Sequence, residues 1–323
     1  MSAKKSDTAV AEAPASRGGL LGLLRGNARW LLFVGVFVAV CAVGWKMLWE
    51  SVREQVISAV DNRIDPEQIE ITPLPAWIHT DLKAEVMRDA SLDGPLSLLD
   101  PELTVHVARA FALHPWVAKV ERVSKQAPAG VAVELIYRRP VAMVEVPGPA
   151  LLPVDADGVL LPTADFSPTE ALHYLRIAEI TTSPLGPVGT RWSDTHVAGA
   201  ARIAAVLLED WETLKLYQIV SAARQVDASG VESDTYELYT RERTRVDWGR
   251  PPGAETGTEA KAAQKVERLR NYAAQHGGSL EDPTGPQRLD VRSASSLTVA
   301  PRPPVQTLPE ANLTPQQRPG VLK

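Results

Sequence analysis

DPELTVHVARAFALHPWVAKV, Asp100–Val120, is the stretch that decides the fold. Asp100 is a good N-cap, and the proline that follows it suits the first position of a helix. Apolar residues then recur with helical spacing at Leu103, Val107, Ala110 and Phe111. This spacing predicts a helix with one buried face. The helix should end at His114-Pro115, because the residue before a proline avoids helical backbone.

The segments on either side extend this stretch into a small α+β domain. Upstream, Ile69–Thr72 reads as a short strand, and Thr80-Asp81 caps a helix that runs to Asp89. Downstream, Val117–Lys125 reads as a strand, and Val131–Tyr137 alternates as a half-buried strand should. The predicted order over residues 67–138 is therefore strand, helix, helix, strand, strand.

Residues 139–300 predict a second, mixed β-domain with flanking helices. The predicted helices are one capped by Ser193-Asp194 and one over Glu259–Gln275. The predicted strands are Val141–Val146, Leu151–Val154, Leu172–Thr181, Leu216–Val220, Tyr236–Thr240, Arg243–Trp248, Arg288–Arg292 and Ser296–Ala300. The last two would form a closing hairpin. The fold class is thus α+β.

One apolar block near the start predicts a transmembrane helix. From Trp30 to Trp49 the only charged residue is Lys46. A helix of this length rises about 30 Å, which matches the hydrocarbon core of a bilayer. Trp30, Trp45 and Trp49 lie near the ends of the block, where amphipathic rings prefer the interface. The block divides the early chain into an arm (1–29), a transmembrane helix (30–49) and a stalk (50–66).

Charge predicts the orientation of this helix. The arm carries five basic residues and two acidic ones, so it should lie in the cytoplasm and the C-terminal part outside it. Two alternatives are a cleaved signal peptide and a lipoprotein modified at Cys41. The long arm and the lack of small residues after Lys46 oppose the first. Bulky Val40 before the cysteine, and the apolar run beyond it, oppose the second.

Composition limits the remaining possibilities. The net charge is −5 over 323 residues, which is not the charge of a typical nucleic-acid-binding protein. The single cysteine lies within the apolar block, so the exported part has no disulfide and must be stabilised by its core. Residues 301–323 hold six prolines and predict an extended or disordered tail.

The sequence contains no catalytic constellation that we recognise. Its six histidines are scattered, and it has no HExxH, GxSxG, P-loop or GxGxxG motif. Asp155–Gly158 faintly resembles a calcium loop, but it lacks the closing Glu, and a hairpin turn is the better interpretation. We therefore expect no catalytic, metal-binding or cofactor-binding residues and no enzymatic activity.

Several stretches together resemble the bacterial cell-division family FtsQ/DivIB. They are His114-Pro115-Trp116-Val117, Glu134 with Arg139-Pro140, Val154–Gly158, Val246–Gly249 with Lys265 and Leu269, and Leu289–Arg292 with Ser296–Val299. The resemblance covers roughly residues 30–300. It implies that residues 67–138 form a POTRA domain and that residues 139–300 form the family's β-domain.

The resemblance also implies a function. It predicts a non-catalytic, single-pass scaffold of the inner membrane that gathers septal proteins at the division site. The implied partners are FtsB/FtsL (DivIC)-like single-pass proteins, with no nucleic acid and no small-molecule substrate. We expect a partner strand to add to the last strand of the β-domain and its hairpin. The expected contact residues are Arg292, Ser293, Ser295, Ser296, Leu297, Thr298 and Val299.

Two rival functions remain open from the sequence. A POTRA-containing export or secretion component would carry several POTRA repeats or a membrane barrel. A membrane-tethered enzyme of the cell envelope would carry a catalytic constellation. The sequence shows neither feature.

Overall fold

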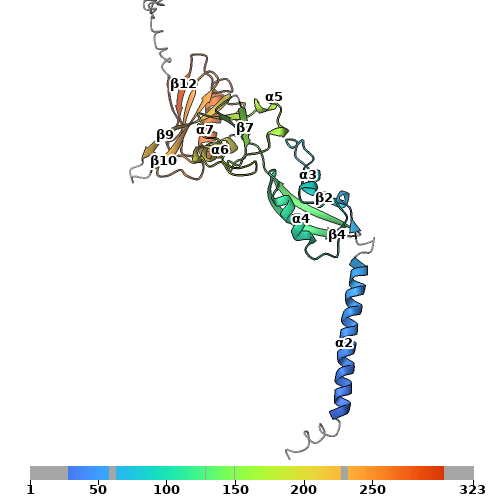
Figure 1. Ribbon diagram of the computed structural model, residues 1–323. Helices are drawn as coiled ribbons and strands as arrows, with labels where there is room; N and C mark the ends of the chain where they lie inside the picture. Colours follow the sequence, from blue (N-terminus) through green and yellow to red (C-terminus); the bar gives the residue numbers. More distant parts are fainter. Residues whose placement is uncertain (1–27, 58–62, 128, 149, 227–231, 302–323) are drawn as a thin grey trace, which may run out of the picture.

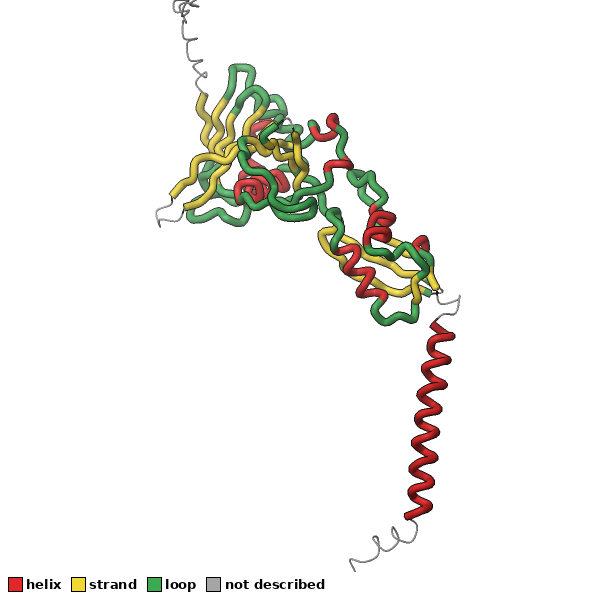
Figure 2. Tube along the Cα trace, in the orientation of Figure 1, coloured by secondary structure: helices red, strands yellow, loops and turns green. Residues whose placement is uncertain are grey.

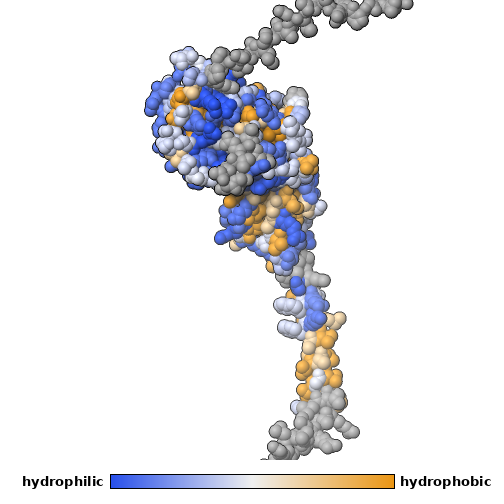
Figure 3. Space-filling model, turned by 90° about the vertical axis from the view of Figure 1, so that its left-hand side faces the viewer, coloured by the Kyte–Doolittle hydropathy of each residue, from blue (hydrophilic) through white to orange (hydrophobic). Residues whose placement is uncertain are grey.

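The computed structural model describes residues 28–57, 63–127, 129–148, 150–226 and 232–301 (Figure 1). Helix α2, Ala28–Ile57, is long and apolar enough to cross a membrane, and its large apolar side chains from Phe33 to Val52 are exposed. They form the orange shaft in Figure 3. Trp30, Trp45 and Trp49 are each more than 60% exposed on this helix. The helix continues past residue 49, so the predicted stalk begins as an extension of the same helix, and most of the arm lies outside the described residues.

A small unit follows α2. Its elements are β1 (Arg63–Ile64), η2 (Pro66–Gln68), β2 (Ile69–Ile71), α3 (Leu82–Asp89), β3 (Leu96–Ser97), α4 (Leu103–Ala112), β4 (Val117–Gln126) and β5 (Gly130–Tyr137). One sheet has the order β2-β5-β4, in which β2 is parallel and β4 antiparallel to β5. The predicted order of strand, helix, helix, strand and strand is present. The two-stranded β1-β3 sheet was not predicted.

The decisive stretch forms the core of this unit. Leu103, Val107 and Phe111 of α4 are buried, and Trp116 beyond the helix is fully buried. The helix begins at Leu103 rather than directly after Asp100. The Asp100 carboxylate accepts a hydrogen bond from the Glu102 amide at 2.9 Å. Asp100 therefore stabilises the turn that precedes the helix.

A larger unit carries an eight-stranded sheet (Figure 2). Its strands are β6 (Ala142–Val146), β7 (Ala150–Val154), β8 (Leu175–Ala178), β9 (Leu216–Val226), β10 (Glu232–Thr240), β11 (Arg245–Gly249), β12 (Gln287–Asp290) and β13 (Thr298–Pro301). The order is β13-β12-β11-β10-β9-β8-β6-β7, with β6-β8, β8-β9 and β11-β12 parallel. Helices α6 (Thr195–Val206) and α7 (Ala262–Gln275) share one apolar core with this sheet.

Several predicted elements of this unit have other bounds in the structure: β9 continues beyond Val220, β10 begins before Tyr236, and β11 begins after Arg243. Three further elements need correction. The predicted strand Leu172–Thr181 is only the four-residue β8, because Ser167 and Glu170 cap a short helix, α5 (Pro168–Ala171), just before it. The predicted helix over Glu259–Gln275 begins at Ala262, since Glu259 turns inward to pair with Lys265. The last strand begins at Thr298, two residues later than predicted.

The two units meet through the segment around η3 (Thr163–Asp165). Leu161 and Phe166 pack against the core of the small unit. The buried Asp165 carboxylate accepts hydrogen bonds from the His79 and Thr80 amides and from the Trp116 indole, at 2.7–2.8 Å. These contacts join the start of α3 and the core of the small unit to the larger unit.

Candidate functional site

The end strand β13 is the candidate docking site. Among the described strands it pairs with β12 alone, in unbroken register from Gln287↔Pro301 to Asp290↔Thr298. All four of its residues are exposed. In an antiparallel strand, alternate residues direct their N–H and C=O groups away from the neighbouring strand. The outer side of β13 therefore presents backbone groups to which another strand can pair.

The other end strands are better protected against such pairing. Strand β4 carries Lys119, Arg122 and Lys125, and its register with β5 shifts twice. Lysine residues and bulges are devices that keep edges from pairing. Strand β2 has only three residues, and β7 contains Pro153, whose carbonyl already accepts from Leu161. Strand β13 is short as well, but it has neither a lysine nor a register shift, and its one proline, Pro301, is its last residue, which leaves Thr298–Ala300 open to pairing.

The loop between β12 and β13 is held at several points. The Ala260 amide donates to the Arg292 carbonyl, and the Ala294 amide donates to the Thr258 carbonyl, both at 2.8 Å. The Arg268 guanidinium, on α7, donates to the carbonyls of Ser293 and Ala294. The hairpin is therefore fixed to the body of the unit, and β13 is presented at small entropic cost to an incoming strand.

A buried ion pair lies beneath this loop. The Lys265 ammonium, fully buried, donates to the Glu259 carboxylate at 2.7 Å and lies 5.1 Å from the centre of the Trp248 ring. Burial lowers the pKa of Lys265, and the pairing with Glu259 opposes that shift. Gly249 has a φ of +86°, and a Cβ there would meet the Glu259 carboxylate. Only glycine leaves room for the pair at this turn.

A charged ladder covers the solvent face of the sheet beside β13. Asp247 accepts from Arg245 and from Arg288, each at 2.7 Å, and Arg245 also pairs with Glu237. This network crosses β10, β11 and β12. The charged ladder therefore makes the solvent face of the sheet polar beside β13. A partner strand that adds to β13 would extend a sheet whose outer face is exposed to water.

Asp290 and Arg292 form a further pair at the end of β12, at 2.6 Å. Burial raises the pKa of Asp290, but hydrogen bonds from Arg292 outweigh it and hold the pKa below its ordinary value. The pairing raises the pKa of Arg292. Both groups are therefore ionised at neutral pH.

The seven predicted contact residues do not share one role. Thr298 and Val299 lie on β13, whereas Ser296 and Leu297 precede it, and Leu297 packs against the core of the larger unit. Ser293 forms a bridge with Glu259, and its hydroxyl lies 2.8 Å from that of Ser295. Ser293, Ser295 and Leu297 therefore belong to the support of the strand.

Sequence reasoning missed other members of the site. The predicted strand ended at Ala300 and the predicted contact residues at Val299, so the structure adds Ala300 to the contact residues and Pro301 to the strand, because a proline is usually taken to end a strand. The support by Arg268 and the Lys265–Glu259 pair was also missed. A lysine on the apolar face of a predicted helix, beside Val266 and Leu269, is the signal that points to a buried partner.

Among the described residues, no group of three histidine, cysteine or acidic side chains is placed to hold a metal ion. No protein-family model matches the chain, and no curated protein matches it.

Proposed function

We propose that this protein is a membrane-anchored, non-catalytic scaffold of the bacterial division machinery that binds its partner by β-strand addition. The observation that carries the proposal is β13, an exposed end strand on a hairpin fixed by Arg268 and the loop at Thr258–Ala260. Backbone pairing would give affinity, and the side chains of alternate residues would give specificity.

The choice of division over other scaffolds rests on the sequence resemblance to FtsQ/DivIB. The order β2, α3, α4, β4 and β5 is the order that a POTRA domain would have. Among the described helices, α2 alone is long and apolar enough to cross a membrane, and it would provide an anchor of the kind that the family uses. We propose that the N-terminal arm is cytoplasmic, that both units lie outside the cytoplasm, and that the partners are FtsB/FtsL-like proteins.

Proline substitution tests the docking strand. Thr298 and Val299 are neighbours on β13, so their backbone groups face opposite sides of the strand. Thr298→Pro and Val299→Pro each remove one donor, one from the outer edge and one from the pairing with β12. We expect one variant to stay folded by circular dichroism and yet lose capture of an FtsB-like partner by at least tenfold.

The matched control is Ser296→Pro, which lies in the same hairpin but precedes the strand. It should retain capture. Full capture by both β13 variants would refute the docking strand. A fluorescent fusion that spreads evenly around dividing cells, in place of collecting at midcell, would refute the role in division while leaving strand addition open.

A further inference from the structure

Lys46 is the deepest charged residue in the apolar span of helix α2. The span that could cross a membrane runs from Phe33 to Arg53, and Lys46 lies seven residues before its end, which is about 10 Å of helix rise. Within the described part of the chain Lys46 forms no hydrogen bond or ion pair, not even with Glu50 one turn further along. Charged residues at such depth are costly in lipid, and they usually face another helix and pair with a group on it.

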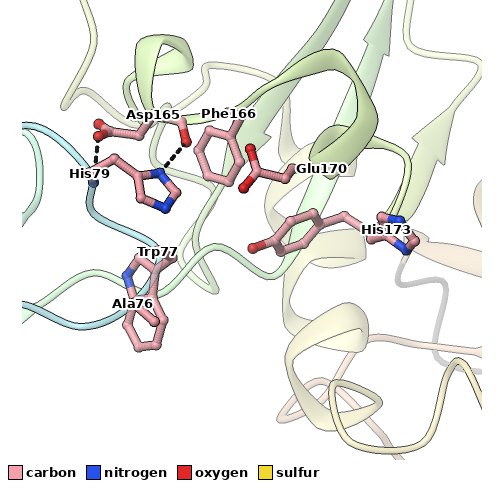
Figure 4. Close-up of a pocket in the computed structure, with 8 residues that line it drawn as sticks. Ala76, Trp77, His79, Asp165, Phe166, Glu170 and His173 are labelled. Atoms are coloured by element: carbon pink, nitrogen blue, oxygen red, sulfur yellow. Dashed lines mark hydrogen bonds between the residues drawn. The ribbon is translucent and has the colours of Figure 1, made fainter.

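The hollow where the two units meet is different, because polar groups that line it already have partners (Figure 4). The His79 ring donates to the Asp165 carbonyl at 2.9 Å, and the Glu170 carboxylate accepts from the Ser167 amide at 2.8 Å. These bonds hold the joint between the units and cap α5. The lone ammonium on α2 is therefore the clearer sign of a missing partner.

Lys46 shares one face of α2 with small residues. Steps of four and three residues alternate along this face, which carries Gly35, Ala39, Ala42, Lys46, Trp49 and Arg53. Such spacing is typical of helices that pack side by side. We call this face the Lys46 seam, and all six of its residues are exposed in the structure.

The two faces of the helix differ in bulk. Phe33 and Phe37, 76% and 69% exposed, fall on the face opposite the Lys46 seam. From Gly35 to Ala42 the seam itself carries only glycine and alanine, which let a second backbone approach closely within a membrane. A neighbouring helix would therefore pack best on the side where the charge lies.

The charge on the Lys46 seam also selects the kind of helix that can pack there. In a parallel pair of copies of this chain, the two Lys46 side chains would lie side by side, and like charges repel strongly where the dielectric constant is low. A helix with an Asp or Glu at the same depth would instead neutralise Lys46, and each group would shield the other from lipid. The seam thus disfavours a second copy and favours an acidic helix.

We propose that the Lys46 seam is the docking surface for a membrane helix of a different protein, one that carries an Asp or Glu at the depth of Lys46. The spacing of the seam predicts a left-handed crossing at about 20°. This inference rests on the membrane anchor of the proposed function, and it is independent of strand addition at β13 and of the division role.

Energy transfer in vesicles of phosphatidylcholine, which has no net charge, tests the docking. The full chain carries a donor dye at Ser51→Cys, on the face away from the seam, in a Cys41→Ser background. The probe is a synthetic Leu/Ala helix of 21 residues, the length of the span, with an acceptor dye and one Glu at position 14, which matches Lys46. We expect at least fivefold more transfer with this Glu peptide than with a Gln peptide. Lys46→Met should abolish the preference, and Lys46→Glu should restore transfer to a Lys peptide.

Gly35→Ile and Gly44→Ile are matched variants, because a Cβ at either glycine would meet nothing within 4 Å in its own chain. Gly35 lies on the Lys46 seam and Gly44 on the opposite face. Gly35→Ile alone should lower transfer to the Glu peptide, by at least threefold. An equal loss with both variants would contradict docking on this face.

Two further outcomes decide the occupant. Equal transfer to the Glu and Gln peptides would overturn the proposal, because Lys46 would then reach the lipid headgroups without a partner. Transfer between two labelled copies of the chain that Gly35→Ile abolishes would make a second copy the occupant, which also contradicts the proposal. Alkaline carbonate separates this inference from the anchor on which it rests: a chain released from the vesicles refutes both, whereas a retained chain that does not distinguish the peptides refutes the seam alone.

Discussion

Replacing Lys265 by methionine tests the buried pair that supports the hairpin. The change keeps most of the side-chain volume but leaves Glu259 without its ammonium partner. Breaking a buried ion pair by removing one partner costs about 3–5 kcal/mol. Glu259 retains hydrogen bonds from the Arg250 amide at 2.8 Å and from its guanidinium at 3.4 Å, so we expect the lower end, about 3 kcal/mol.

For a unit of this size, a loss of about 3 kcal/mol lowers Tm by roughly 6–12 °C. Calorimetry of the full chain in detergent measures this shift. Lys261→Met is the matched control, because Lys261 precedes the same helix and is exposed, with its ammonium 3.9 Å from Glu255. It should change stability by less than about 1 kcal/mol. If both variants melt together within a degree of the parent protein, the pair does not stabilise this loop.

Three further predictions concern the two cores and acid stability. Phe111→Ala should destabilise the small unit by about 3–5 kcal/mol, since Phe111 is fully buried, whereas Leu113→Ala, 80% exposed at the end of the same helix, should be nearly neutral in chemical denaturation. Gly199→Ala should lower Tm although alanine favours helices, because its Cβ would lie 1.9 Å from the Tyr236 hydroxyl; a rise in Tm would show that this contact is absent. Asp290 has a lowered pKa in the folded state, so the unfolded chain binds more protons between the two pKa values, and stability is lost as the pH falls through that interval. Asp290→Asn should flatten this acid limb in denaturant titrations at pH 2–5.

The sequence predicted elements wherever local signals agreed. The apolar face of α4, the Asp81 and Asp194 caps, and the alternation of β5 were all visible, because helix and strand periods are set by backbone geometry. The apolar block of α2 needed no tertiary context either, since its length and composition alone identify it as a possible membrane span. The predicted start of α7 was wrong where a side chain pairs outside the helical pattern, since Glu259 turns to Lys265 before the helix begins.

What only the tertiary structure decided is how segments distant in sequence combine. The pairing of β12 with β11 in parallel, and of β13 with β12 alone, makes β13 an end strand, and no local pattern contains that order. At the junction, Asp165 forms hydrogen bonds with His79, which lies 86 positions earlier in the chain, and with Trp116, which lies 49 positions earlier. Such contacts depend on burial and on hydrogen bonds between chain segments that become neighbours only after folding, so they leave no periodic signal in the sequence.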